Sequence, residues 1–172
     1  MMTETDLLII GAGPAGCSAA IYAVRAGVKT VIAGGAAPGG QLLQTSDIEN
    51  YAGFVNPVGG FEIMDAMHKQ CKRLGVEFTT DQVVKIEGEK TPFTVTCEGG
   101  KTYQAKSIVI ATGAKARWLG LAEEEKFKGH GLSACATCDG FFMRGKSVCV
   151  VGAGTRLLKM RSFFPNSARK CI

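Results

Sequence analysis

Two cysteines separated by two residues, Cys135 and Cys138, are followed directly by a carboxylate, Asp139. This spacing lets both sulfurs meet across a single turn, and a helix that begins there would lower a thiol pKa through the partial charge of its N-terminus. A dithiol built in this way can cycle between its oxidised and reduced forms. Thiol exchange also needs a protonated leaving group, and a carboxylate beside the pair can manage that proton. The pattern therefore favours redox chemistry.

Three other interpretations of the cysteine pair compete with this one. A zinc site needs four ligands, but the other cysteines occur singly and His68 and His130 lack ligand spacing, so no metal site is predicted. A structural disulfide is disfavoured in a reducing compartment. Two buried, unreactive thiols would account for the spacing but would leave Asp139 unexplained.

The size of the chain bounds what can position such a dithiol. Its 172 residues, 46% of them hydrophobic, suffice for one domain or for one domain and the start of another. Glu4 and Asp6 precede an apolar run of only four residues, so neither a signal peptide nor a membrane-spanning segment is expected. Seven cysteines without an export signal predict a reducing, cytoplasmic location.

The net charge of +5 comes from the C-terminal end of the chain. Up to Gly154 the chain carries fifteen basic and fifteen acidic residues, and the last eighteen residues add five basic residues and no acid. A nucleic-acid-binding tail is the weakest functional interpretation, because this charge has no structured context. No nucleic-acid or membrane partner is expected.

The start of the chain has the pattern of a dinucleotide-binding fold. The apolar run Leu7–Ile10 leads into glycines at positions 11, 13 and 16, a stretch compatible with a helix to Ala26, and a second apolar run at residues 28–32. In such a fold the first glycine makes the turn, the second lets the backbone approach a pyrophosphate, and the third lets helix pack on strand. The acid that often binds a ribose hydroxyl is missing, since Ala33-Gly34-Gly35 follow the second strand.

The remaining pattern extends this α/β fold. A glycine loop at residues 38–42 leads to a polar segment at residues 45–50, either a cofactor contact or a plain surface loop. Apolar spacing predicts an amphipathic helix over residues 61–74, in which His68 is a packing or surface residue rather than a ligand. Strands are expected at residues 76–86, 93–97 and 103–105, a meander covering one face of the sheet, followed by a buried strand that starts at Ser107 and ends in a turn at Gly113.

A second nucleotide-binding unit is expected to begin after a domain boundary near Lys115. The polar stretch from Lys115 to Lys128 predicts a solvated face, and residues 146–154 repeat the opening pattern of strand and glycine turn. We therefore expect an FAD-type domain over residues 1–114, the start of a second Rossmann-like domain over residues 115–154, and a separate tail over residues 155–172.

The combination of motifs resembles bacterial-type, low-molecular-weight thioredoxin reductase. The segments that carry the resemblance are residues 11–16, 39–42, 47–50 and 111–113, and above all residues 134–140. The resemblance implies a homodimeric flavoprotein that passes electrons from NADPH through FAD and a dithiol to thioredoxin. It implies that Cys138 lies against the flavin, that Cys135 exchanges with the thioredoxin sulfur, and that Asp139 supplies or takes the proton.

The resemblance also assigns the cofactor contacts. Gly11, Gly13 and Gly16 would cradle the FAD pyrophosphate, and Gly40, Gln41, Asn50 and Thr112 would line the flavin. The other residues expected at the cofactor are Pro14, Ala15, Gly39, Leu42, Thr45, Ala111 and Gly113.

The resemblance ends near Gly154, about halfway along the length of the family's members. Leu157 stands where the second glycine turn needs a small residue, and Pro165 would interrupt a following helix. Deleting one G from a gene reading GGG GAC ACG GCT GTT GAA GAT GCG yields Gly-Thr-Arg-Leu-Leu-Lys-Met, the sequence observed from Gly154. We therefore expect an out-of-frame tail, a missing NADPH-binding body, an inactive chain and poor solubility caused by exposed apolar surface.

Two functional alternatives stay open at this stage. One is a related flavin reductase that feeds a different dithiol partner, such as a glutaredoxin-like or peroxiredoxin-linked protein. The other is a non-enzymatic FAD or redox module.

Overall fold

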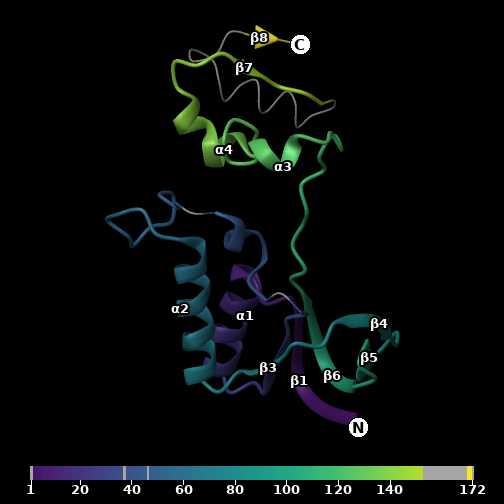
Figure 1. Cartoon of the computed structure of the whole chain (residues 1–172). Coiled ribbons are helices and arrows are strands. Elements are labelled where there is room, and N and C mark those ends of the chain that lie inside the picture. The colour runs from purple at the N-terminus through teal and green to yellow at the C-terminus, as the bar shows by residue number, and fades with distance from the viewer. Residues whose placement is uncertain (1, 37, 46, 153–169, 172) are drawn as a thin grey trace. The chain divides into compact units, whose positions relative to one another are not determined.

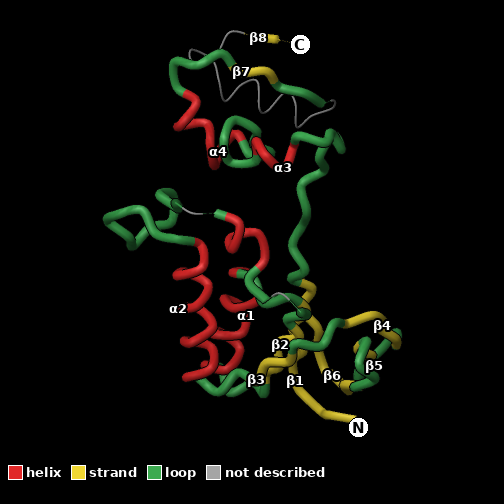
Figure 2. The backbone as a smooth tube through the Cα atoms, in the orientation of Figure 1, coloured by secondary structure: helices red, strands yellow, loops and turns green. Residues whose placement is uncertain are grey.

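The computed structural model describes residues 2–36, 38–45, 47–152 and 170–171. The chain divides into two compact units, Met1–Lys115 and Ala116–Ile172. Each unit has its own elements, which are labelled along the chain in Figure 1 and coloured by type in Figure 2.

The first unit is built on one six-stranded sheet in the order β3-β2-β1-β6-β5-β4. Strand β1 pairs in parallel with both β2 and β6, and β2 pairs in parallel with β3. Strands β4, β5 and β6 form an antiparallel meander at the other edge. The strands are β1 (Met2–Ile10), β2 (Thr30–Ala33), β3 (Glu77–Thr79), β4 (Val83–Glu87), β5 (Phe93–Cys97) and β6 (Thr102–Ile110).

The two faces of this sheet are covered differently. Side chains alternate between the faces of a strand, so the adjacent buried residues Leu8 and Ile9 belong to separate cores. Ile9 packs with helices α1 (Pro14–Arg25) and α2 (Gly60–Arg73), whereas Leu8 packs with meander residues such as Val95 and Tyr103. The predicted α/β class and the meander covering one face are therefore confirmed.

The structure corrects three details of the predicted strands. Residues 103–105 and 107–110 belong to one continuous strand, β6, which serves both the parallel sheet and the meander. The stretch 76–86 is broken into β3 and β4, which lie at opposite edges of the sheet. The carboxyl half of β6 is not fully buried, because Ile110 is 70% exposed.

The second unit contains short elements. They are α3 (Glu124–Phe127), α4 (Ala136–Asp139), the 3-10 helix η2 (Gly140–Met143), β7 (Val148–Cys149) and β8 (Lys170–Cys171), of which β7 and β8 pair in parallel. The acidic cluster predicted to be solvated is only partly so. Glu123 and Glu125 are exposed, but Glu124 is 7% exposed, because its carboxylate accepts the backbone N–H groups of Leu119 and Gly120 at 2.7 and 3.0 Å.

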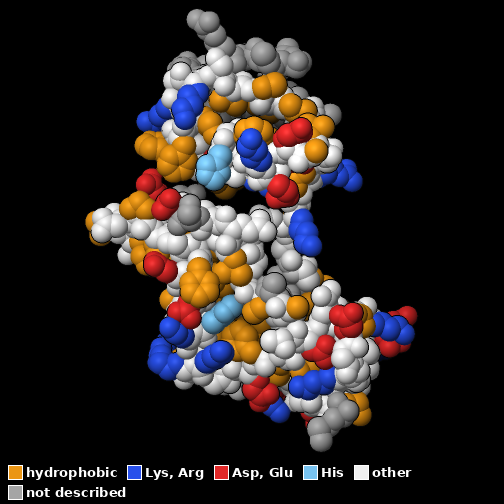
Figure 3. Space-filling model, viewed as in Figure 1, with side chains coloured by type: hydrophobic (Ala, Val, Ile, Leu, Met, Phe, Trp, Pro, Cys, Tyr) orange, Lys and Arg blue, Asp and Glu red, His pale blue; other side chains and the backbone are white. Residues whose placement is uncertain are grey.

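Most of the expected out-of-frame tail, residues 155–169 and 172, lies outside the described residues, and that expectation stays a prediction. The same holds for Ala153 and Gly154 of the second glycine turn. Figure 3 shows hydrophobic side chains at the surface of both units. Those of Phe141 and Leu121 are 59% and 61% exposed. None of the described helices is long and apolar enough to cross a membrane.

The core between sheet and meander gives a test of this packing. Truncation of fully buried Val95 to alanine leaves a cavity against Leu8, and we expect the free energy of unfolding to fall by about 2 kcal/mol. Val84 on the adjacent strand β4 is 58% exposed, so Val84→Ala serves as the matched control, with an expected change below about 0.5 kcal/mol. Urea unfolding followed by circular dichroism measures both. Equal losses in the two variants would contradict this assignment of the core.

Candidate functional site

The first glycine segment is crowded at two of its three glycines. Gly11 has a φ of 113°, and a Cβ there would lie 2.2 Å from the Ala111 carbonyl oxygen. A Cβ on Gly16 would lie 1.9 Å from the Gly11 carbonyl oxygen. Both contacts are with backbone, which cannot move aside as a flexible side chain can. Glycine at these positions therefore lets α1 and the ends of β1 and β6 approach each other.

The middle glycine, Gly13, has room for a Cβ atom beside it. The nearest atom to a Cβ built on Gly13 is the Gly39 carbonyl oxygen at 3.9 Å. Gly13 caps the N-terminus of α1 without a side-chain hydrogen bond, Pro14 follows it, and the first turn holds no acidic residue. An anion fits such a terminus, because the first backbone N–H groups of a helix have no intrahelical acceptor. The residues present therefore fit the pyrophosphate of a dinucleotide.

The other two glycine segments converge on the same edge of the sheet. A Cβ on Gly40, at the start of the 3-10 helix η1 (Gly40–Gln44), would lie 3.9 Å from the Gly13 Cα atom. The Gln41 side-chain amide donates to the Ala114 carbonyl, directly after the third segment. The Ala111 N–H donates to the Ile10 carbonyl at 2.8 Å. Segments that are far apart in the sequence thus meet at the carboxyl ends of β1, β2 and β6, where an open α/β sheet binds its ligand.

The remaining predicted cofactor residues lie in different surroundings. Ala15 is exposed at the start of α1, and Thr112 and Gly113 follow β6 in exposed backbone. The side chain of Leu42 packs against the apolar cores instead.

Thr45 has a structural contact in the same loop, since its carbonyl accepts the Gly60 N–H at 3.0 Å. Asn50 is exposed, and no described hydrogen bond connects it with the glycine segments. The role of Asn50 at the cofactor stays a prediction.

Two residues that sequence reasoning did not place at this site contact its first turn. His68 of α2 lies with its Nε2 atom 2.8 Å from the Ala12 carbonyl oxygen, and the Cys17 Sγ atom lies 3.7 Å from the same oxygen. The helical spacing of His68 among apolar residues indicated packing only. A carbonyl acceptor some fifty residues away leaves no local pattern in the sequence.

The buried cysteines of the first unit have raised thiol pKa values, unlike the low pKa that a reactive cysteine needs. Burial, and then the neighbouring Cys71, raise the pKa of the Cys17 thiol to about 12. Burial also raises the pKa of Cys71 and Cys97. Since the thiolate is the reactive form, these three thiols are less reactive than an exposed thiol.

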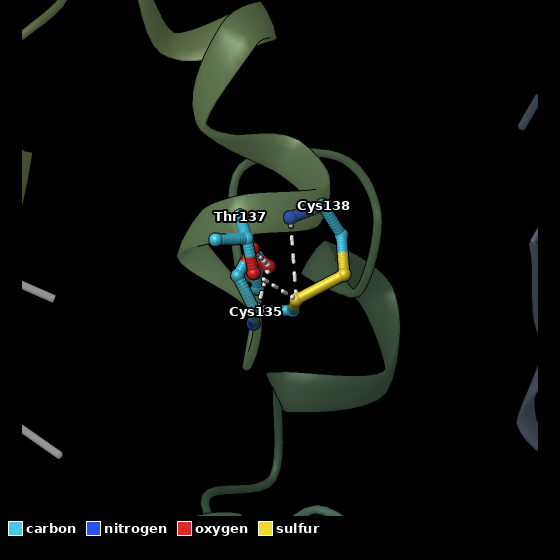
Figure 4. The surroundings of a disulfide bond; sticks show 4 residues. Cys135, Thr137 and Cys138 are labelled. Carbon is cyan, nitrogen blue, oxygen red and sulfur yellow. Dashed lines mark hydrogen bonds between the residues drawn. A yellow bond between two sulfur atoms is a disulfide. The ribbon is translucent and has the colours of Figure 1, made fainter. Parts of the chain in front are cut away.

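The cysteines of the second unit form a disulfide, Cys135–Cys138, with their Cα atoms 5.3 Å apart (Figure 4). The Cys135 side chain is half-buried and the Cys138 side chain is exposed. Ser133 fixes the backbone before the disulfide, because its hydroxyl accepts the Cys135 N–H at 3.0 Å and lies 3.3 Å from the Cys135 carbonyl. The exposed Cys138 side chain makes the disulfide accessible to an attacking thiolate.

The two sulfurs differ in their hydrogen-bond donors. The Cys135 Sγ atom accepts the Cys138 backbone N–H at 3.2 Å, and it lies 3.4 Å from the Thr137 hydroxyl, which must be the donor because a disulfide sulfur carries no hydrogen. Figure 4 shows both donors directed at this sulfur. No described hydrogen bond reaches the Cys138 sulfur. Donors to a sulfur favour its thiolate after reduction, so the asymmetry favours Cys135 as the nucleophile.

Asp139 ends helix α4, directly after Cys138. Its side chain is half-buried and makes no described hydrogen bond to either sulfur. Among the described residues no group of three or more His, Cys, Asp or Glu side chains is placed to hold a metal ion.

The sequence matches the model of a known protein family. Residues 5–156 match the family described as pyridine nucleotide-disulphide oxidoreductase. The chain belongs to this family, because the match spans most of its length.

Within the family, the chain is similar to thioredoxin reductases. It is 48% identical over 170 residues to the thioredoxin reductase of Rickettsia conorii and 43% identical over 165 residues to that of Escherichia coli O157:H7. These alignments cover 99% and 96% of this chain, but 55% and 51% of the relatives. The chain thus spans about half the length of the curated relatives it matches.

Solved structures give the same result for the fold. The thioredoxin reductase of Streptococcus pyogenes is 40% identical with a TM-score of 0.88, and that of Giardia duodenalis is 34% identical with a TM-score of 0.89. Each comparison covers 96% of this chain and 54% of the solved chain.

The contact of Gly16 with the first turn predicts a large effect of one methyl group. In Gly16→Ala the new Cβ must push α1 away from the Gly11 carbonyl, and we expect the free energy of unfolding to fall by roughly 3 kcal/mol. Ser18→Ala, at an exposed position of the same helix, should change it by less than about 0.5 kcal/mol. Thermal or urea unfolding measures both variants. A Gly16→Ala chain as stable as Ser18→Ala would show that the close approach does not exist in solution.

The burial and the raised pKa of Cys17 predict selective alkylation. A pKa raised to about 12 leaves roughly one part in ten thousand of Cys17 as thiolate at pH 8, so iodoacetamide should not label it in the folded chain. After mild reduction, Cys135 and Cys138 should be labelled, because both lie at the surface in the disulfide turn. Mass spectrometry of peptides distinguishes the sites. In denaturant Cys17 should react like the others, and rapid labelling in the folded chain would refute its burial.

Proposed function

We propose that the chain carries the flavin-binding and dithiol parts of a thioredoxin-disulfide reductase. The observation that carries the proposal is the disulfide Cys135–Cys138, in which the Cys135 sulfur has two hydrogen-bond donors and the Cys138 sulfur has none among the described residues. The similarity to thioredoxin reductases supports it, although the chain spans only part of their length. Electrons would pass from NADPH through FAD to the disulfide, and from the dithiol to thioredoxin.

The glycine cluster is the proposed FAD site. Gly13 and the open N-terminus of α1 would hold the pyrophosphate, and Gly40, Gln41, Asn50 and Thr112 would line the flavin. FAD, when bound, supplies two-electron reduction chemistry that accepts hydride and reduces a disulfide. This chain's own residues bind and orient it. Among them, the crowded Gly11 and Gly16 keep the turn close enough to the sheet for backbone N–H groups to face the ligand.

The exchange step itself needs only the dithiol. The Cys135 thiolate attacks one sulfur of the thioredoxin disulfide, forms a mixed disulfide, and releases the other thioredoxin sulfur as a thiolate that takes a proton. The Cys138 thiolate then attacks the Cys135 sulfur, re-forms the Cys135–Cys138 disulfide, and releases the second thioredoxin thiol. The dithiol loses two electrons and thioredoxin gains them.

The donors of the second unit match this order of events. The Cys138 N–H and the Thr137 hydroxyl would stabilise negative charge on the Cys135 sulfur before attack. Asp139 is proposed to take the Cys138 proton, since it follows that residue directly in α4. A cytoplasmic homodimer and an NADPH site in the second domain complete the proposal, and both come from the resemblance to the longer family members.

Trapping tests which sulfur attacks and which partner it prefers. The probe is a thioredoxin that keeps a single active-site cysteine, activated as its mixed disulfide with thionitrobenzoate, whose release gives a colour. With Cys138→Ser, Cys135 should displace the dye and form an intermolecular disulfide. With Cys135→Ser, the reaction should be about tenfold slower, because the remaining sulfur lacks the two donors.

The partner is tested with a glutaredoxin activated in the same way. Thioredoxin should react at least about tenfold faster with the Cys138→Ser chain. A glutaredoxin that reacts equally fast would favour the related reductase with another dithiol partner. Equal rates for Cys138→Ser and Cys135→Ser would refute the assignment of Cys135 as the nucleophile.

A further inference from the structure

The turn between β1 and α1 is held from the side of the helices by a histidine. The His68 Nε2 atom lies 2.8 Å from the Ala12 carbonyl oxygen. A carbonyl oxygen can only accept, so the hydrogen of this bond belongs to Nε2. His68 is half-buried and belongs to α2, while Ala12 is 3% exposed in the turn. The bond therefore joins α2 to the turn in a largely dry environment.

The same carbonyl has a second, weaker donor. The Cys17 Sγ atom of α1 lies 3.7 Å from the Ala12 oxygen, and its raised pKa keeps it as a thiol that can donate. The two lone pairs of the carbonyl thus face α2 and α1. Its direction is set by side chains from two helices, not by the turn alone.

The direction of this carbonyl decides where the next N–H points. The peptide bond from Ala12 to Gly13 is trans, and in a trans peptide the C=O and N–H groups point in opposite directions. The Gly13 N–H must therefore point away from the donors on α1 and α2. No described hydrogen bond uses this N–H, and a Cβ built on Gly13 would have the Gly39 carbonyl oxygen, at 3.9 Å, as its nearest neighbour outside the adjoining residues. A fixed carbonyl on one side gives a fixed, available donor on the other.

The imidazole ring is itself held in place. Its centroid lies 5.5 Å from that of Phe78 on β3, with the ring planes at 67°, an edge-to-face contact. The Lys72 ammonium lies 5.8 Å from the Phe78 ring centroid. The orientation of His68 thus depends on β3 as well as on α2, and the ring cannot swing away from Ala12 without losing an aromatic contact.

We propose that His68 is a positioning residue for dinucleotide binding, which holds the Ala12 carbonyl so that the Gly13 N–H faces the pyrophosphate. The proposal rests on the proposed FAD site, and it goes beyond the glycines by giving their backbone a side-chain anchor. A histidine that merely filled space would be replaced equally well by leucine. A histidine that acts as a donor is replaced by glutamine, whose amide N–H can reach a carbonyl, and not by leucine.

The first measurement does not need a ligand. In ¹⁵N NMR spectra of the 172-residue chain, the His68 ring should be in the Nε2–H tautomer. The Gly13 amide resonance should shift in His68→Leu and return toward its wild-type position in His68→Gln. Gln70→Leu, an exposed change on the same helix, should leave it unmoved. An Nδ1–H tautomer, or a Gly13 resonance indifferent to His68→Leu, would overturn the proposal even if the leucine variant folded poorly.

The second measurement uses FAD itself, titrated into the same four chains and followed by quenching of its fluorescence. We expect the dissociation constant to rise about tenfold in His68→Leu, because a buried carbonyl loses its strong donor and the Gly13 N–H loses its direction. It should rise no more than about threefold in His68→Gln and stay unchanged in Gln70→Leu. Equal weakening in the leucine and glutamine variants would overturn the donor role.

The two measurements distinguish failure of the proposed flavin site from failure of the positioning role of His68. If the wild-type chain binds no FAD, the proposed flavin site fails, while the tautomer and the Gly13 resonance still decide whether His68 anchors the turn. If the wild-type chain binds FAD and His68→Leu binds it equally well, the flavin site stands and the positioning role is refuted.

Discussion

The close approach of three backbone segments at the end of β1 is the constraint on which the first unit depends. Gly16 lies so near the Gly11 carbonyl, and Gly11 so near the Ala111 carbonyl, that neither position has room for a Cβ atom. Helix α1 can lie this close to the sheet only because Gly11 and Gly16 have no side chains. Every feature of the proposed dinucleotide site follows from this contact, including the open N-terminus of α1 and the arrival of the segment after β6 beside it.

Strand β6 makes that contact compatible with a stable core. It pairs with β1 along its whole length, and its first half also pairs with β5. One strand therefore belongs to the parallel layer that carries the glycine turns and to the meander that closes the opposite face. The meander needs no separate core, because Val95 and Tyr103 bury themselves against Leu8, while Ile9 on the other face packs with the helices.

The buried cysteines and the disulfide cysteines differ in reactivity because their surroundings differ. Cys17 and Cys71 lie between the helices, where low polarity keeps them protonated and unreactive. Cys135 and Cys138 lie in a short turn of the second unit, and the hydrogen bonds that reach the Cys135 sulfur come from residues two and three positions away. The disulfide is thus held by local contacts and needs little tertiary support, whereas the burial of the other thiols depends on the fold.

The sequence by itself determined the features whose causes are local. Hydrophobic alternation, glycine spacing and the spacing of Cys135 and Cys138 act within a few residues, so the first strand, α1, α2, the meander and the dithiol could be predicted from them. The tertiary structure alone decided that β6 is one strand and that the Glu124 carboxylate accepts two backbone N–H groups. It also decided that His68 reaches Ala12, because the Nε2 atom and the carbonyl oxygen are brought together only when α2 packs with α1 against the Ile9 face of β1. Contacts between distant segments depend on how elements dock, and no periodicity within either segment encodes them.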